Sequence, residues 1–263
     1  MARRPSPIAV APALLLVAIS AWEVCAARRD AEAVPGDPAW HAAAERVRAG
    51  FQAGDLIVFA PAWVDPVGRL HLGDLIPLTA AARMDAARYG RIWELAIRGA
   101  RSPDTAGLVP AWEGDAGGVA VRLYERAPAI VVGDVLERRE TATTTGAPPS
   151  LELTEVGFAP HRCLQVSPAP GVPLRITFPA FPLGRELVGY VGIADVFTRR
   201  DVRSPGRLEV EIAGRVIASA EPGVDDGWVR FAAATTPGAA DVTFIARATD
   251  ASRRICFAAE ARR

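Results

Sequence analysis

The sequence predicts an α+β protein in which a small α/β domain precedes an all-β sandwich. Two observations support this prediction. Between residues 37 and 138, amphipathic stretches with helical spacing alternate with short apolar runs, which is the order of an α/β domain. After residue 150 the chain becomes a series of short strand-like segments separated by Gly, Pro and Asp turns, a pattern typical of a β-sandwich.

The N-terminus has the layout of a secretory signal. Arg3 and Arg4 form a short positive region, and residues 8–21 form an apolar run without charge. Val24-Cys25-Ala26 then matches a small-x-small cleavage pattern. The apolar run has about 14 residues, fewer than the roughly 20 that span a bilayer. We therefore expect residues 1–26 to act as a signal peptide or as an N-terminal membrane anchor.

Two alternatives to cleavage depend on single residues. Trp22 lies where an interfacial aromatic residue would extend the segment into an uncleaved anchor. Cys25 raises the alternative of a lipoprotein, although Trp22, Glu23 and Val24 do not fit a lipobox. In each case the body of the protein lies outside the cytoplasm, secreted, periplasmic or anchored to the cytoplasmic membrane.

The expected α/β domain occupies residues 37–138, after a polar and Ala-rich tether at residues 27–36. Asp37-Pro38 is a helix-start signal, with Asp as N-cap and Pro in the first turn. The following segments are expected in order: a helix at 38–53, a buried strand at 56–60, a loop at 61–74, a helix at 77–89, and strands at 91–97, 118–125 and 129–137.

Residues 139–150 have linker composition, and residues 151–263 are expected to form the sandwich. Ala213-Gly214 lies between two alternating segments and predicts a tight hairpin turn. The expected strands are 151–156, 161–166, 174–178, 187–193, 208–213, 215–220, 228–233, 241–248 and 254–261.

Composition excludes several classes of chemistry. The chain has 263 residues, with 30 basic and 30 acidic side chains and a net charge of zero. Such a balance favours neither nucleic acid nor an anionic surface as a partner. All basic residues are arginine, and asparagine is absent. A Schiff-base lysine, a P-loop lysine, a Ser-Lys dyad and an N-glycosylation acceptor are therefore excluded.

Residues 40–124 resemble the soluble α/β domain appended to membrane glycosyltransferases that use polyprenyl-phosphate sugars. The resemblance is carried by the entry helix, the GDLIVFAPAW strand and loop starting at Gly54, and Arg91-Ile92-Trp93. The catalytic residues of those enzymes lie in a multi-span membrane part that has no counterpart in this sequence. The resemblance therefore implies a fold and a membrane setting, and it assigns no catalytic residue.

Residues 163–262 resemble jelly-roll domains of the galactose-binding or carbohydrate-binding kind. The resemblance is carried by the LEVEIAGRVI hairpin from Leu208, a Gly-Trp pair at 227–228, and a V-x-F strand after a Thr-Pro-Gly turn. It implies a jelly-roll-like sandwich. Patterns of this kind describe packing, so they bear on fold more than on function.

Cys163 and Cys256 are the cysteines that remain beyond the N-terminal segment. One lies on an early strand of the expected sandwich and the other on its last strand, and such strands are often neighbours in jelly rolls. An even pair in an oxidising compartment indicates a disulfide. Two buried free thiols are the alternative.

Four candidate catalytic residues lie in the expected loop after the 56–60 strand: Asp65, Arg69, His71 and Asp74. Ligands of α/β sheets bind beyond the carboxyl ends of strands. Asp and His together could hold a metal ion or perform acid–base chemistry. The alternative is structural, with an Asp65–Arg69 salt bridge and Asp74 as a helix cap.

Five candidate ligand-binding residues lie on two charged loops of the sandwich: Asp195, Arg199, Asp225, Asp226 and Trp228. In carbohydrate-binding sandwiches, loop carboxylates bind Ca²⁺ or sugar hydroxyls and an exposed aromatic ring stacks on the sugar. The alternative is Arg–Asp pairing on the rim, with Trp228 in the core. The three histidines lack the spacing of a zinc site.

These patterns favour a non-enzymatic envelope protein that binds a glycan or a protein partner of a surface-polysaccharide or glycosylation system. Ca²⁺ is the one cofactor that the charged loops allow. The alternative is an envelope enzyme that acts on a sugar or a lipid-linked sugar through the loop from Asp65 to Asp74. An enzyme needs a concave site where this loop meets other polar groups, whereas a binding module needs an exposed face or rim.

Overall fold

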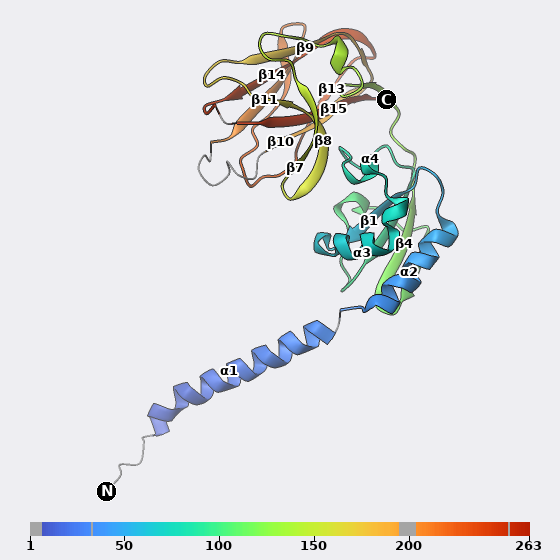
Figure 1. Cartoon of the computed structure of the whole chain (residues 1–263), viewed down its shortest axis with the longest axis vertical. Helices are drawn as coiled ribbons and strands as arrows, with labels where there is room; N and C mark the ends of the chain where they lie inside the picture. Colours follow the sequence, from blue (N-terminus) through green and yellow to red (C-terminus); the bar gives the residue numbers. More distant parts are fainter. Residues whose placement is uncertain (1–6, 33, 195–203, 252) are drawn as a thin grey trace. The chain divides into compact units, whose positions relative to one another are not determined.

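The computed structural model describes residues 7–32, 34–194, 204–251 and 253–263 (Figure 1). The chain divides into two compact units. The first unit comprises Met1–Leu75 and Arg91–Glu125, and the second comprises Ile76–Gly90 and Arg126–Arg263. The chain therefore passes between the units three times, and a short segment that lies early in the sequence belongs to the second unit.

The N-terminal segment is helical over its whole described length. Helix α1 spans Pro7–Glu32. Within the described residues, a 21-residue stretch of α1, Ala11–Ala31, is long and apolar enough to cross a membrane, with a mean hydropathy of 1.5. None of this stretch is buried against the rest of the protein. A signal sequence and an anchor would both have this character.

The first unit is built on a mixed sheet with strand order β1-β2-β4-β3, in which β1 and β2 are parallel. Helix α2 buries Trp40, Ala43 and Val47. The elements are α2 (Asp37–Gly50), β1 (Leu56–Ala60), η1 (Ala62–Val64), α3 (Asp65–Leu72), η2 (Gly73–Leu75), β2 (Arg91–Ala96), η3 (Pro103–Thr105), β3 (Trp112–Ala116) and β4 (Val119–Glu125).

The sequence does not predict two elements of this unit. Residues 61–74, expected to be a loop, form the continuous helical stretch η1-α3-η2. This stretch packs directly on β1, because Gly68 lies so close to the Phe59 ring that an added Cβ would approach it to 1.9 Å. Strand β3 was not predicted, since its sequence WEGDA has little strand character and depends on pairing with β4.

The second unit is a β-sandwich (Figure 1). One sheet, here the β15 sheet, has the order β13-β10-β15-β8-β7, with β5 also paired to β15; the other, the β14 sheet, has the order β12-β11-β14-β9-β6. Its elements are α4 (Leu78–Ala81), β5 (Val131–Asp134), η4 (Arg139–Thr141), β6 (Thr143–Thr144), β7 (Ser150–Val156), β8 (Ala159–Val166), β9 (Leu174–Leu183), β10 (Glu186–Ile193), β11 (Gly206–Ile212), β12 (Arg215–Ala220), β13 (Val229–Ala234), β14 (Gly238–Ala248) and β15 (Ile255–Arg262).

The core lies between the two sheets. Alternate residues of β15, including Phe257 and Ala259, join Phe178 and Phe244 of the β14 sheet in one buried cluster. The intervening residues of β15 lie on the opposite side of the β15 sheet, here called its outer face: Cys256, Ala258, Glu260 and Arg262. The predicted turn at Ala213-Gly214 joins β11 to β12, and both residues have positive φ.

Residues 77–89 differ from the expected helix, since only Leu78–Ala81 is α-helical. Beyond that turn the backbone carbonyl groups accept hydrogen bonds from the sandwich instead of from the next helical turn. Ala82 O accepts from Arg162 N at 3.0 Å, and Ala87 O accepts from Ala129 N at 2.8 Å. Tertiary hydrogen bonds have therefore replaced the helical ones.

The boundary between the units also differs from the expected one. The expected linker, residues 139–150, contains η4 and β6, and β6 pairs with β9. Residues 129–137 were expected to be the last strand of the first domain, but β5 pairs with β15 in the sandwich. The physical reason is burial, because Val135 and Ala142 pack into the sandwich core.

Cys163 of β8 and Cys256 of β15 form a disulfide, with 5.6 Å between their Cα atoms. Strands β8 and β15 are antiparallel neighbours, and both cysteines are fully buried. Among the described residues the free cysteine is Cys25, which is exposed on α1.

Replacing both bonded cysteines by alanine (C163A/C256A) is expected to lower the free energy of unfolding by about 4–5 kcal/mol, because the bond closes a long loop in the unfolded chain. Chemical denaturation measures this, with C25A as the control that leaves stability unchanged. Before any substitution, the denatured but unreduced full chain should titrate as a single thiol. Three reactive thiols would contradict the bond.

Candidate functional site

The four candidate catalytic residues of the first unit do not converge on one point. Asp65 and Arg69 form an ion pair along α3. Both carboxylate oxygens of Asp74 accept a hydrogen bond from Arg48 at 2.6 Å, and this interaction lowers the pKa of the carboxyl group. His71 Nε2 lies 3.3 Å from Asp37. The Asp65–Arg69 salt bridge of the structural alternative is present, whereas Asp74 pairs with Arg48 and does not cap the next helix, α4, whose N-cap is Pro77.

The candidate residues on the loops of the sandwich have different positions. Asp195 and Arg199 lie outside the described residues. Asp225 is exposed. Asp226 accepts a hydrogen bond from Gly223 N at 2.8 Å, which closes the turn before β13. Within the described part of the chain, no group of three or more His, Cys, Asp or Glu side chains is placed to hold a metal ion.

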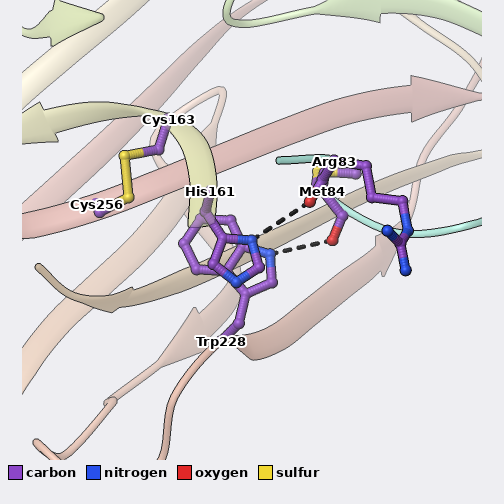
Figure 2. The surroundings of a disulfide bond; sticks show 6 residues. All are labelled: Arg83, Met84, His161, Cys163, Trp228 and Cys256. Atoms are coloured by element: carbon purple, nitrogen blue, oxygen red, sulfur yellow. Dashed lines mark hydrogen bonds between the residues drawn. A yellow bond between two sulfur atoms is a disulfide. The ribbon is translucent and has the colours of Figure 1, made fainter. Parts of the chain in front are cut away.

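Trp228 is a packing residue of the outer face and does not form an exposed platform (Figure 2). Its ring stacks on His161 with 4.4 Å between centroids and on Tyr190 with 6.0 Å between centroids. Its indole N–H donates to Met84 O at 3.1 Å. It also packs against the group that contains the Cys163–Cys256 disulfide. A sugar would have to displace these contacts to stack on the ring.

His161 is held in its neutral form by the same packing. Desolvation lowers the pKa of His161 to about 4, and its hydrogen bond to the Arg83 carbonyl only partly opposes this effect. Nδ1 lies 3.3 Å from that carbonyl oxygen. Because a carbonyl oxygen only accepts, Nδ1 carries the proton in the neutral ring.

An ion-pair network closes the rest of the outer face. Arg262 donates to Asp85 Oδ1 and Oδ2 at 2.9 Å and to Glu260 Oε2 at 3.0 Å. Arg88 donates to Glu260 Oε1 at 2.6 Å and also to Asp134. Burial raises the pKa of Glu260, and the two guanidinium groups oppose this rise. The segment 76–90 is thereby fastened over the outer face.

Two hollows of the sandwich lie at one end, around the β13–β14 loop, and a third, of about 280 Å³, lies where α4 meets β7 and β8. The first is a groove of about 550 Å³ lined by residues that include Leu183, Arg215, Thr235 and Thr236. The second, of about 500 Å³, is lined by residues that include Arg185, Glu186 and Arg263. Both are lined by Ala234, so they are neighbours. Their volumes lie in the range of small-ligand sites.

Hydrogen bonds between strand ends hold this groove in shape. Thr235 N donates to Arg185 O at 2.8 Å, and Thr235 Oγ1 donates to Gly184 O at 2.9 Å. Arg185 N donates to Arg262 O at 2.7 Å. A side chain on Gly184 would place its Cβ 2.0 Å from Arg262 O. The β9–β10 connection therefore requires glycine where it crosses the end of β15.

Three exposed arginines give the groove its charge: Arg185, Arg215 and Arg263. Among the described residues, no carboxylate forms an ion pair with any of them. Among the described residues, Glu186 is the one acidic side chain that lines the two hollows. A guanidinium group presents a planar pair of donors to a carboxylate or phosphate, so the groove has the chemistry of an anion site.

Sequence reasoning missed this groove. Its residues come from the ends of β9, β12, β13 and β15, and no motif links them along the chain. The only local signals were the tight Ala213-Gly214 turn, which places Arg215 at the end of a hairpin, and the Thr-Pro-Gly turn after Thr235.

Comparison with known proteins gives structures but no family. No family model matches the chain, and no curated protein matches it. Among solved structures it is similar to the CBM51-2 and INT domains of Clostridium perfringens ZmpB in complex with GlcNAc. That match has 11% identity and a TM-score of 0.37, and it covers 56% of this chain and 35% of that one.

Two further similar structures are single modules. One is CBM51 from Clostridium perfringens GH95 in complex with methyl-galactose, with 10% identity, a TM-score of 0.35, and coverage of 50% of this chain and 99% of that chain. The other is a β-1,3-glucan-binding CBM6 from Bacillus halodurans, with 13% identity, a TM-score of 0.30, and coverage of 44% and 85%. Each of the three structures contains a carbohydrate-binding module.

The neutral His161 predicts a specific pH dependence. The unfolded chain protonates this residue near its ordinary pKa, whereas the folded chain resists protonation until about pH 4. The contribution of His161 to the free energy of unfolding is therefore fully present above about pH 6.5. It is lost as the pH decreases to 4, by about 3 kcal/mol in total.

Denaturation curves between pH 7 and pH 4 measure this slope. His161→Gln should reduce this slope by the equivalent of about one bound proton. His41→Gln, which changes an exposed histidine of α2, should leave it as in the natural chain. An unchanged slope in H161Q would show that the burial of this ring does not control stability.

Proposed function

We propose that the protein is a non-enzymatic, extracytoplasmic envelope protein whose sandwich binds an acidic glycan at the groove around Thr235. On this proposal α1 carries the chain into or across the cytoplasmic membrane, the first unit is a small α/β domain, and the sandwich contains the binding site. The partner system is one that makes or displays a surface polysaccharide.

One observation carries the proposal. Arg185, Arg215 and Arg263 line a rigidly framed hollow, and no described carboxylate neutralises them. Because the whole chain has a net charge of zero, this local excess of positive charge is not a general property of its surface. Unpaired arginines at the rim of a concave site favour a ligand that carries carboxylates or phosphates.

The shape of the groove favours a polymer over a small free anion. Its two hollows adjoin at Ala234 and present separate guanidinium groups, Arg215 in one and Arg185 with Arg263 in the other. A chain of charged sugars offers anionic groups at repeated intervals, so several can be bound at once. Among the described residues, the lining contains no aromatic ring, so recognition depends on charge and hydrogen bonding, with Thr236 available as a further donor.

Two features agree with an extracytoplasmic site. The Cys163–Cys256 disulfide is suited to an oxidising compartment. The apolar N-terminal helix supplies a route to that compartment. The competing enzyme hypothesis relied on Asp65, Arg69, His71 and Asp74, and these side chains form separate pairs.

The test is binding of polygalacturonate, measured by isothermal titration calorimetry, with its fully methyl-esterified form as the neutral counterpart. The acidic polymer should bind and the ester should not, and binding should weaken as the NaCl concentration rises, because salt screens exposed charges. Arg185→Gln and Arg215→Gln should each weaken binding about ten-fold, as expected for loss of a charge-assisted hydrogen bond.

Arg230→Gln is the matched control. It removes an exposed arginine of β13 that does not line the groove, so it should leave the affinity unchanged. Equal losses in R230Q, R185Q and R215Q would indicate non-specific attraction. Equal binding of the polymer and its ester would contradict an anion site, and an acidic peptide that competes better than the polyuronates would point to a protein partner.

A further inference from the structure

The helical stretch at 62–72 of the first unit turns uncharged residues towards solvent. Its exposed positions are Ala62, Trp63, Pro66, Val67 and Leu70. Trp63 is 57% exposed and Leu70 is 83% exposed. A surface helix ordinarily directs its apolar residues to the core and charged residues to solvent, so this face, here called the Trp63 face, needs an explanation.

The Trp63 face is not the side of the stretch that packs on the core. The opposite side of the same stretch is already buried through Val64, Gly68 and Leu72. Asp65 and Arg69 lie at the border between the two sides and neutralise each other. The stretch therefore has two apolar sides. One is buried against β1 and the other is exposed to solvent, and the Asp65–Arg69 pair at their border has no net charge.

The Trp63 face lies beside the C-terminal end of α1. Trp63 follows β1 and Arg98 follows β2, and these parallel strands end at the same edge of the sheet. The Arg98 guanidinium lies 5.9 Å from the centroid of the Trp63 ring. The same guanidinium donates a hydrogen bond to the carbonyl oxygen of Asp30, which lies where the apolar stretch Ala11–Ala31 ends.

We propose that the Trp63 face is an interfacial membrane contact, which lies in the headgroup layer of the bilayer that α1 enters. Tryptophan favours this layer, and amphipathic segments bury their apolar side about 5–10 Å into it. Arg98 lies close enough to Trp63 to pair with a lipid phosphate. The inference rests on the part of the proposed function that places α1 in the membrane, and it is independent of glycan binding.

The experiment uses the full chain in nanodiscs with an environment-sensitive fluorophore on single cysteines, and with lipids brominated near the headgroup as quenchers. Three labels are compared: native Cys25 on α1, Leu70→Cys in a Cys25→Ser background, and Val172→Cys in the same background. Val172 is an exposed apolar residue of the sandwich and is the matched control. Leu70 is exposed enough that its replacement should leave the fold intact.

The labels at Cys25 and Leu70 should both be quenched about two-fold or more, and the label at Val172 should not be quenched. Quenching at Cys25 without quenching at Leu70 would overturn this inference and leave the membrane role of α1 standing. No quenching at Cys25 would overturn both. A blue-shifted Leu70 label that brominated lipid does not quench, and whose shift grows with protein concentration, would show a contact between two copies and also overturn it.

Discussion

Two carboxylates face each other across neighbouring strands, and much of the second unit follows from that arrangement. Glu260 of β15 is the register partner of Asp134 of β5, and both are buried. Like charges directly opposite in a sheet repel, and buried charges without partners are costly. Arg88 lies between them and binds both. The two carboxylates therefore need the segment 76–90 in this position, because it supplies the cation that they share.

That requirement determines which surface is open to ligands. Arg88 of the segment binds Glu260 and Asp134 of the sheet, and Arg262 of the sheet binds Asp85 of the segment. Met84 and Arg83 thereby cover Trp228 and His161 on the outer face of the β15 sheet. Trp228 then supports the disulfide region instead of stacking on a sugar. The unpaired arginines remain at the end of the sandwich, where loop residues are held by strand-end hydrogen bonds. The proposed binding site is thus moved from the face of the sheet to its rim.

The sequence predicted those elements whose alternation and turn residues lie close together along the chain. Strands β7 to β15 were expected because their alternation and turns lie within a few residues of each other, and the Ala213-Gly214 turn shows this directly. Residues 77–89 were expected to be helical because their carbonyl partners, such as Arg162, lie far away in sequence. The groove was missed for the same reason, since sheet register brings Arg185 and Arg215 to one end of the sandwich.

Amide hydrogen exchange at Arg162 and Ala129 tests the central claim most directly, because these amides donate to Ala82 and Ala87 of the fastened segment. In the natural chain both should be protected. Arg88→Met leaves Glu260 and Asp134 without their shared cation, so both amides should exchange at least about ten-fold faster, while Arg48→Met, which breaks an exposed pair in the first unit, should leave them unchanged. Equal protection in R88M and in the natural chain would contradict the claim that this ion-pair network holds the segment on the sandwich.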